Sequence, residues 1–466
     1  MNRLLLSFVL IAAFSWQSFA ASPRETATVQ LIRKIKPTVV PVYPVENDRP
    51  LGSGTASIIH PAGFMLSNDH VSKGKSGLAL VNGERRPYRV IGRLPGKDIT
   101  LLQLRTKSPL PFIRLGRSHD LMTGEPTIAA GNPGGRGIIF TQGIVSAPSI
   151  MDGVNALMMS YFQSGRDEFV QFDAASNPGN SGGPLVNALG EQIGIVSSGV
   201  VSEENSNYAI PIDRVRSLFN NLLPVEVMSD FWTGIEIDTL ADRAVVKSVA
   251  KNSPAAKAKI KAGDIITSLN GNPVHTGVDW ILGLVGGKSG NEAKLQLAGK
   301  KKRSAKFKLV PYPLPKVAGR TGKVAGLNYE VHHGKFKVLP DFDGLKPAQT
   351  GTTDELATES LVEGRDEYFA LVFTGYLDIP KNGVYRLTLG SDDGSKLFLG
   401  GKLLIDNDDN HPMQHLSRIV RMQKGLNPFR LEYFDYTGDA ELELKIEGGL
   451  HKKTTDIPNE MFFRDE

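Results

Sequence analysis

The six residues from Gly179 to Pro184, Gly-Asn-Ser-Gly-Gly-Pro, restrict this chain more than any other stretch does. Small residues on both sides of Ser181 allow a tight backbone turn. Such a turn brings backbone N–H groups to one place beside the serine hydroxyl. A serine attacks a carbonyl only when a base takes its proton and preset N–H donors stabilise the developing oxyanion. The loop therefore predicts a nucleophile, Ser181, and an oxyanion hole formed by Gly179, Asn180 and Ser181.

A base and an orienting acid for this serine stand earlier in the chain. His70 follows the apolar segment 64–67, so its ring is expected just after a strand. Asp98 directly precedes the apolar run 99–104, whose packing is expected to bury the carboxylate. A buried carboxylate fixes the tautomer of an imidazole and stabilises the imidazolium. We therefore assign His70 as base, Asp98 as orienting acid and Ser181 as nucleophile. The alternatives are a structural glycine turn, a loop histidine and a capping acid, or an intact triad held misaligned.

The pattern along the chain indicates several mainly β domains. A length of 466 residues suggests two to four domains. Short apolar runs between Gly, Pro and Asn clusters continue to about residue 215, which is typical of an all-β barrel domain, and the proline-rich stretch 311–315 is typical of a linker. We predict a protease domain over 27–220, a second unit over 229–311, a linker over 312–324 and a β-sandwich over 325–466.

The first residues have the features of an export signal. Residues 1–20 contain a positive start at Asn2-Arg3, an apolar core and a small-residue cleavage site at Ser18-Phe19-Ala20. An uncleaved anchor is the alternative, although the apolar run is shorter than the ~20 residues that span a bilayer. The chain has no cysteine, which excludes disulfides, thiolate catalysis and zinc–thiolate sites. Export without disulfides favours a bacterial cell envelope and the periplasm.

The net charge of +5 is mild, and the basic residues are scattered apart from a cluster at 300–303. We interpret this cluster as a solvated hairpin tip and predict no nucleic-acid partner.

The residues around the three catalytic candidates resemble the HtrA/Deg family of chymotrypsin-fold serine proteases. The resemblance covers nearly all of 27–220 and extends through 131–135, 141–146 and 171–178. It implies two six-stranded barrels with the active site in the cleft between them. It also implies acyl-enzyme chemistry without a metal or organic cofactor, and homo-oligomers, with trimers formed through the segment 29–35.

The same resemblance places the primary specificity pocket on two segments of the second barrel. Its walls are expected to include Phe172, Ile195, Val196, Ser197 and Ser198. No acidic residue stands where it would meet a cationic P1 side chain. We therefore predict cleavage after small or medium-sized apolar residues.

The second unit resembles the PDZ domain that follows the protease in this family, through residues 246–258 and 262–271. Such a domain adds a peptide C-terminus as a strand to a sheet edge, and backbone N–H groups capture the terminal carboxylate. The resemblance implies that the carboxylate loop and first strand comprise Trp232, Thr233, Gly234 and Ile235. A spacer with a closed groove is the alternative. Lys259 stands where the family usually has glycine, so we expect a strained or rebuilt turn there.

The C-terminal unit resembles a protective-antigen-type β-sandwich from residue 326 to about 463, most clearly in 383–399. In lectin-like members, paired aspartates hold a calcium ion that binds sugar hydroxyls. Asp392 and Asp393 are therefore the candidate calcium ligands, because adjacent carboxylates suit a hard cation with oxygen ligands. The alternative is turn chemistry, in which these side chains cap backbone N–H groups.

Taken together, the sequence predicts an exported serine endopeptidase that cleaves unfolded or specific cell-envelope proteins. Its partners would be polypeptide substrates, peptide C-termini at the PDZ domain and glycans at the C-terminal domain. The alternative from another functional class is a latent protease that acts as a chaperone-like or carbohydrate-binding envelope scaffold.

Overall fold

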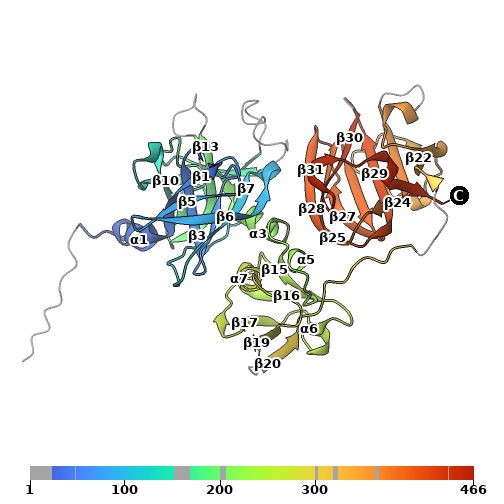
Figure 1. Ribbon diagram of the computed structural model, residues 1–466. Coiled ribbons are helices and arrows are strands. Elements are labelled where there is room, and N and C mark those ends of the chain that lie inside the picture. The colour runs from blue at the N-terminus through green and yellow to red at the C-terminus, as the bar shows by residue number, and fades with distance from the viewer. Residues whose placement is uncertain are drawn as a thin grey trace, which may run out of the picture.

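A computed structural model gives the fold of most of the chain. It describes residues 24–47, 49–151, 168–199, 206–299, 303–318, 324–362, 367–438 and 440–465. The export signal assigned to residues 1–20 lies outside the described residues. Among the helices that are described, none is long and apolar enough to cross a membrane. Two β-barrels come first, followed by a small sheet with two helices and then a β-sandwich (Figure 1).

The first barrel follows a short amphipathic helix. Helix α1 (Ala27–Ile35) begins after Thr26, whose hydroxyl accepts the N–H of Val29, and it leads through the 3-10 helix η1 (Lys36–Thr38) into the sheet. The barrel closes because the last strand of its order pairs again with the first. In that order its strands are β1 (Val39–Glu46), β3 (Gly54–His60), β4 (Phe64–Ser67), β7 (Ile99–Leu104), β6 (Glu84–Leu94) and β5 (Ser76–Val81), with β2 (Arg49–Pro50) attached to β1.

The second barrel closes in the same way, through pairing of β12 with β13. In spatial order its strands are β12 (Pro184–Asn187), β9 (Pro126–Gly131), β10 (Ile139–Met151), β11 (Glu168–Phe172), β14 (Asn207–Pro211) and β13 (Glu191–Gly199), and β8 (Arg114–Leu115) joins β13 in parallel. Two closed six-stranded barrels confirm the predicted chymotrypsin-like double barrel. Loops of the two barrels meet, because the N–H of Thr55 on β3 donates to the carbonyl of Ser181, which precedes β12, at 3.0 Å.

Three short helices connect the second barrel to the next unit: α3 (Ile212–Ser217), α4 (Phe219–Leu222) and α5 (Val225–Met228). The sheet that follows has the order β15 (Ile235–Asp238), β16 (Ala244–Val249), β17 (Ile265–Leu269), β19 (Glu292–Ala298) and β20 (Arg303–Lys308), with β18 (Asn272–Pro273) paired to β17. Helices α6 (Pro254–Lys257) and α7 (Gly277–Gly283) complete the unit. The buried Trp280 fixes α7 to this core. Strand β15 therefore lies at the edge of its sheet, beside α7 (Figure 1).

The turn at Lys259 keeps the backbone conformation that a glycine would favour. Lys259 has a φ of 63°, which lies in the left-handed region that side chains with a Cβ disfavour. Its N–H donates to the carbonyl of Ala256 at 3.0 Å. The expected strain at this turn is therefore present, and the turn has not been rebuilt.

The C-terminal unit is a β-sandwich. Leu371 and Leu431 of one sheet pack with Leu387 and Ile446 of the other in a shared core. The first sheet contains β21 (Val324–Ala325), β22 (Leu327–His333), β23 (Gln349–Thr353), β24 (Phe369–Ile379), β26 (Ser395–Leu399), β27 (Lys402–Asn407), β29 (Gly425–Asp435) and β32 (Phe462–Arg464), and the second contains β25 (Gly383–Asp392), β28 (Gln414–Met422), β30 (Glu441–Gly448) and β31 (His451–Asp456).

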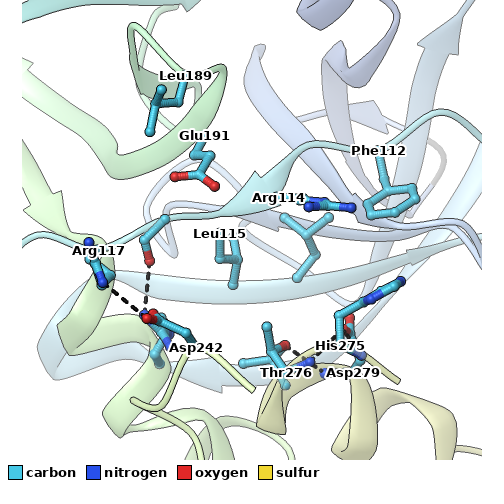
Figure 2. A pocket seen from close by; sticks show the side chains of 14 residues that line it. Phe112, Arg114, Leu115, Arg117, Leu189, Glu191, Asp242, His275, Thr276 and Asp279 are labelled. Atoms are coloured by element: carbon cyan, nitrogen blue, oxygen red, sulfur yellow. Dashed lines mark hydrogen bonds and ion pairs between the residues drawn. The ribbon is translucent and has the colours of Figure 1, made fainter. Parts of the chain in front are cut away.

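A buried arginine joins the second barrel to the unit that follows it. Arg216 of α3 is 2% exposed, and its guanidinium donates to the carbonyls of Thr239, Leu240 and Ala241 at 3.0, 2.7 and 2.8 Å. Beside it lies a cavity of about 340 Å³ between β8 and α7, bordered by an ion pair of 3.0 Å between Arg117 and Asp242 (Figure 2). Because all three carbonyls belong to the loop between β15 and β16, this contact holds one unit against the other.

Candidate active site

His70 and Asp98 form a close pair in the first barrel. His70 follows β4 and Asp98 immediately precedes β7. The imidazole Nδ1 lies 2.8 Å from Oδ2 and 3.0 Å from Oδ1 of Asp98, and the backbone N–H of His70 donates to Oδ1 at 2.9 Å. The carboxylate is buried, with a side chain 6% exposed, whereas the imidazole is 36% exposed. This pairing holds the ring in one orientation and leaves part of it accessible to a substrate.

The backbone around Asp98 explains how the carboxylate reaches the imidazole. The 3-10 helix η2 (Pro95–Lys97) ends at Asp98, which has a left-handed φ of 51°. The carbonyl of Asp98 accepts bonds from the side-chain amide of Asn68 at 3.1 Å and the N–H of Asp69 at 3.3 Å. Arg93 in turn holds the carboxylate of Asp69 with two contacts of 2.6 and 3.0 Å. The segment that carries His70 is thus fixed against the loop that carries Asp98.

The nucleophile loop is anchored to the first barrel although it belongs to the second. The Thr55 hydroxyl donates to the carbonyl of Gly179 at 2.7 Å, and the N–H of Thr55 donates to the carbonyl of Ser181 at 3.0 Å. A Cβ on Gly182 would lie 2.2 Å from both the hydroxyl of Ser67 and the carbonyl of Thr55. Only glycine therefore fits this position, which is the physical reason for the Ser-Gly-Gly run.

The Ser181 hydroxyl donates to the backbone carbonyl of Ser197, with 2.5 Å between the oxygens. Ser197 lies on β13, and its own hydroxyl reaches Oδ2 of Asp98 at 3.4 Å. The sequence assigned Ser197 to the substrate pocket. The structure instead places it in contact with both Ser181 and Asp98, so the three candidate residues converge on one region between the barrels.

Of the backbone N–H groups around Ser181, that of Asn180 is hydrogen-bonded within the loop, whereas those of Gly179 and Ser181 are not. The N–H of Asn180 donates to the carbonyl of Asn177 at 2.9 Å, so the structure assigns it no oxyanion role, contrary to the expectation from sequence. Across the parts of the chain that the structure describes, the N–H groups of Gly179 and Ser181 have no hydrogen-bond partner. These are the two donors that a developing oxyanion requires.

The side chains assigned to the specificity pocket lie mainly in the core. Phe172, Ile195 and Val196 are 0% exposed and Ser197 is 1% exposed. Phe172 and Val196 fill the second barrel, whereas Ile195 faces the other hydrophobic cluster, because adjacent residues of a strand point to opposite faces. These side chains therefore support the pocket from behind and do not form its surface. The side chain of Ser198 lies outside the described residues.

The proposed carboxylate loop of the second unit already contacts a carboxylate of this chain. The Thr233 hydroxyl donates to Oε1 of Glu226 at 2.5 Å, and the Thr233 N–H donates to Oε2 at 3.4 Å. Ile235 donates its N–H to the Thr233 hydroxyl at 3.1 Å, and Trp232 pairs with Val310. Burial raises the pKa of Glu226 to about 7. Glu226 was not identified from the sequence, where no local pattern distinguishes it.

The candidate calcium ligands lie at the turn between β25 and β26. The Asp393 carboxylate accepts the N–H of His411 at 3.0 Å and the N–H of Tyr436 at 2.7 Å. Burial raises the pKa of Asp393. Within the described ranges, no group of three or more His, Cys, Asp or Glu side chains is arranged to hold a metal ion. Asp393 thus has the role of the alternative interpretation, a side chain that caps backbone N–H groups.

Comparison with known proteins divides the chain into three matched regions. Residues 53–195 match the trypsin-like peptidase domain, residues 233–309 match the PDZ domain, and residues 323–460 match the PA14 domain. These matches confirm the protease, PDZ and protective-antigen-type resemblances seen in the sequence.

Curated relatives match about half of the chain. The periplasmic serine endoprotease DegP of Salmonella typhimurium is 37% identical over 246 residues, which are 48% of this chain and 49% of the relative. DegP of Escherichia coli is 36% identical over 245 residues, with the same coverage of 48% and 49%. The chain thus spans about half the length of the curated relatives it matches.

Among solved structures, a serine endoprotease from Yersinia pestis is 26% identical, with 62% of this chain and 98% of that chain covered and a TM-score of 0.37. The HtrA-type protease AlgW with a tripeptide is also 26% identical, with the same coverage of 62% and 98% and a TM-score of 0.38.

Proposed function

We propose that this chain, which carries a trypsin-like peptidase domain, a PDZ domain and a PA14 domain, is an exported, periplasmic serine endopeptidase. Its substrates are unfolded or specific cell-envelope proteins. The observation that carries the proposal is the contact of 2.8 Å between the His70 imidazole and the buried Asp98 carboxylate, to which Ser181 is linked through Ser197. The similarity to DegP, a periplasmic serine endoprotease, supports the compartment and the reaction.

The geometry supports acyl transfer by three side chains and two backbone N–H groups. His70 takes the proton from the Ser181 hydroxyl as Oγ attacks the scissile carbonyl, and Asp98 stabilises the imidazolium that forms. The N–H groups of Gly179 and Ser181 stabilise the oxyanion. The imidazolium then donates its proton to the leaving amine as the C–N bond breaks, which leaves an ester on Ser181. Water, deprotonated by His70, hydrolyses this ester and regenerates the serine. These steps require no metal or organic cofactor.

A preference for small or medium-sized apolar P1 residues is supported by the sequence of the segment expected beside the pocket, because residues 195–199 include no acidic residue. A carboxylate in the pocket would be needed to compensate a buried P1 cation. Mass-spectrometric identification of cleavage sites in a peptide library tests this preference. Dominant cleavage after Lys or Arg would contradict it.

Digestion of unfolded casein tests the reaction. Removal of the nucleophile in Ser181→Ala should lower turnover by at least ~10⁴-fold, because oxyanion and binding effects alone remain. Ser229→Ala, in the connection after α5, is the matched control and should digest at the wild-type rate. An unchanged digestion rate in Ser181→Ala would end the protease proposal.

We also propose that the PDZ domain binds peptide C-termini and that the protein assembles into homo-oligomers, with a trimer formed through α1. Val29 on this helix is 38% exposed, which leaves an apolar side chain for contact with a second copy. The molar mass measured by light scattering should correspond to three chains, and Val29→Asp should lower it. If Val29→Asp has the same molar mass as the wild type, α1 does not form the interface between copies.

A latent scaffold is the second candidate function. The bond from Ser181 to Ser197 favours it, because the hydroxyl proton is directed toward a carbonyl. A chaperone-like scaffold would prevent casein aggregation equally well in wild type and Ser181→Ala. If the wild type digests casein and Ser181→Ala does not, the protein is a protease and not only a scaffold.

Calcium-dependent glycan binding by the C-terminal domain is not part of the proposed function. Both Asp393 carboxylate oxygens accept backbone N–H groups. Among the described residues no group of three or more His, Cys, Asp or Glu side chains is arranged for a metal ion, whereas calcium takes 6–8 oxygen ligands. Calorimetry with calcium, together with a glycan array, tests this assignment. Binding in both assays would restore the lectin interpretation.

A further inference from the structure

The PDZ domain has a groove between its edge strand and its second helix. Strand β15 lies at the sheet edge, and a cavity of about 380 Å³ extends from it to α7. Apolar side chains from both elements line the cavity: Ile235 and Ile237 of β15, and Trp280, Ile281 and Leu284 beside or on α7. A peptide added here would run along β15 and place its terminal carboxylate at the loop that precedes this strand.

Helix α5 lies against the loop that would capture that carboxylate, and one of its side chains contacts the loop. Glu226 and Val227 of α5 also line the groove. The two oxygens of Glu226 accept the hydroxyl and the N–H of Thr233, at 2.5 and 3.4 Å. The carbonyl of Glu226 additionally accepts the N–H of Phe231 at 3.2 Å. The chain therefore places a carboxylate of its own against the N–H and the hydroxyl of Thr233 in the carboxylate loop.

A contact with the C-terminal domain holds α5 in this position. Arg421 of β28 donates from Nε to the carbonyl of Val227 at 3.2 Å, and the same nitrogen lies 3.5 Å from Oδ1 of Asp230. Its side chain is 17% exposed. Helix α5 is thus fastened to the PDZ loop through Glu226 and to the β-sandwich through Val227. A helix of four residues has little intrinsic stability, so these external contacts determine where it lies.

We propose that Glu226 is an internal ligand of the PDZ groove, which occupies the place of a peptide's terminal carboxylate and must leave before a peptide C-terminus binds. The proposal rests on the proposed function of the PDZ domain as a receptor for peptide C-termini. A peptide binds only to the fraction of molecules in which Glu226 has left, so its apparent Kd is raised by the inverse of that fraction. Two hydrogen bonds to a carboxylate are enough to raise the apparent Kd about tenfold.

Fluorescence anisotropy with the full-length chain tests the proposal. All proteins carry Ser181→Ala so that the probe is not digested. The probe is a fluorescein-labelled peptide that ends in Val-Tyr-Val with a free carboxylate, and the control probe is the same peptide with a C-terminal amide. Glu226→Ala removes the internal ligand. Met228→Ala is the matched control, because Met228 is on the same helix, is 44% exposed and does not line the groove. Arg421→Ala loosens α5 without alteration of the groove itself.

We expect Glu226→Ala to bind the free-carboxylate peptide at least about tenfold more tightly than the parent protein, and Arg421→Ala to shift affinity in the same direction. Met228→Ala should match the parent, and the amide should bind weakly throughout. Equal affinity of the parent, Glu226→Ala and Arg421→Ala would overturn the inference and leave peptide recognition intact. If none of the proteins binds the peptide, both the internal-ligand inference and the proposal that the PDZ domain binds peptide C-termini are overturned. The casein assay tests the protease reaction separately.

Discussion

The hydroxyl of Ser181 and the carbonyl of Ser197 are joined by a hydrogen bond of 2.5 Å. A hydroxyl has one proton to donate, so this proton must turn away from the Ser197 carbonyl before His70 can take it. A bond of this kind contributes about 0.5–1.5 kcal/mol net. It therefore lowers the competent fraction of the enzyme by roughly tenfold at most.

Because this hydrogen bond reduces the competent fraction by no more than about tenfold, we predict that the protease is active without an activator. The wild-type protein should hydrolyse unfolded casein without any added activator, because one hydrogen bond is too weak to hold the site inactive. Release of labelled fragments over time, compared with Ser181→Ala, measures this activity. A protein that is silent until a peptide ligand is added would show that a larger rearrangement controls the site.

The buried Arg216 predicts how firmly the protease and PDZ domains are joined. Arg216→Leu would leave three carbonyls of the loop between β15 and β16 without their donor, in addition to the contacts with Gly116 and Asp213. We expect a loss of about 3 kcal/mol or more in the stability of the junction. Thermal unfolding should show a lower Tm and a separated transition for the PDZ domain.

Arg216→Lys provides the comparison, since a lysine keeps the charge and lacks the planar set of five donors. It should recover only a minor part of the stability. A cooperative unfolding transition at the wild-type temperature in Arg216→Leu would show that other contacts, such as the Arg117–Asp242 ion pair, hold the domains together without Arg216 (Figure 2).

The left-handed backbone at Lys259 predicts a stabilising substitution. Lys259→Gly should raise the free energy of unfolding of the PDZ domain by about 0.5–1 kcal/mol, because glycine adopts a φ of 63° without steric conflict. The entropy of the more flexible unfolded chain offsets part of the gain. Urea denaturation of the two proteins measures the difference. Lys257→Gly, within α6, is the control and should destabilise by a similar amount; destabilisation by Lys259→Gly itself would contradict the account.

The parts of the fold that the sequence predicts well are those set by local patterns. Strand β17 (Ile265–Leu269) lies inside the segment 262–271 that carries the PDZ resemblance. The loop around Ser181 was predicted because local packing requires its residues, such as Gly182, where a Cβ would clash. Helix α7 was not predicted, because glycines stand at both of its ends, although the capping box of Thr276 and Asp279 marks its start.

The features that the sequence does not predict depend on distant contacts. The contact of Glu226 with Thr233 joins a linker helix to a loop through side-chain geometry, and neither residue has a distinctive neighbourhood. The pocket assignment failed for Phe172 and Ile195 because strand register decides which face is buried. The turn at Asp393 is fixed by N–H groups from His411 and Tyr436, which lie on separate later segments.

Protonation of Glu226 predicts that peptide binding depends on pH. Burial raises the pKa of the docked carboxyl from its ordinary value of 4.5 to about 7. Between pH 4.5 and about 7, the Glu226 carboxyl is protonated when it contacts Thr233 and ionised when it has left the groove. A rise in pH through this range therefore favours the state in which Glu226 has left the groove. We expect the apparent Kd for the free-carboxylate peptide to fall by about fivefold or more between about pH 5.5 and 7.5 and to level off above that range.

The groups around Glu226 do not produce the same dependence. Glu236 of β15 has a lowered pKa because Lys247 and Ser248 donate to it, and Tyr312 has a raised pKa through burial. Asp230 and Arg421 pair with each other, with 3.5 Å between Oδ1 and Nε. Glu226→Ala should therefore bind the peptide with a nearly constant Kd over this range. An equal pH dependence in Glu226→Ala would assign the effect to another group.

Covalent labelling shows whether Ser181 is a nucleophile that His70 activates. The protein is treated with a fluorophosphonate, which loses fluoride when a serine oxygen attacks phosphorus, and its peptides are mapped by mass spectrometry. We expect a single phosphonyl adduct on Ser181 in the wild type and its loss in His70→Ala. An adduct on another residue, or equal labelling of Ser181 in His70→Ala, would contradict the account.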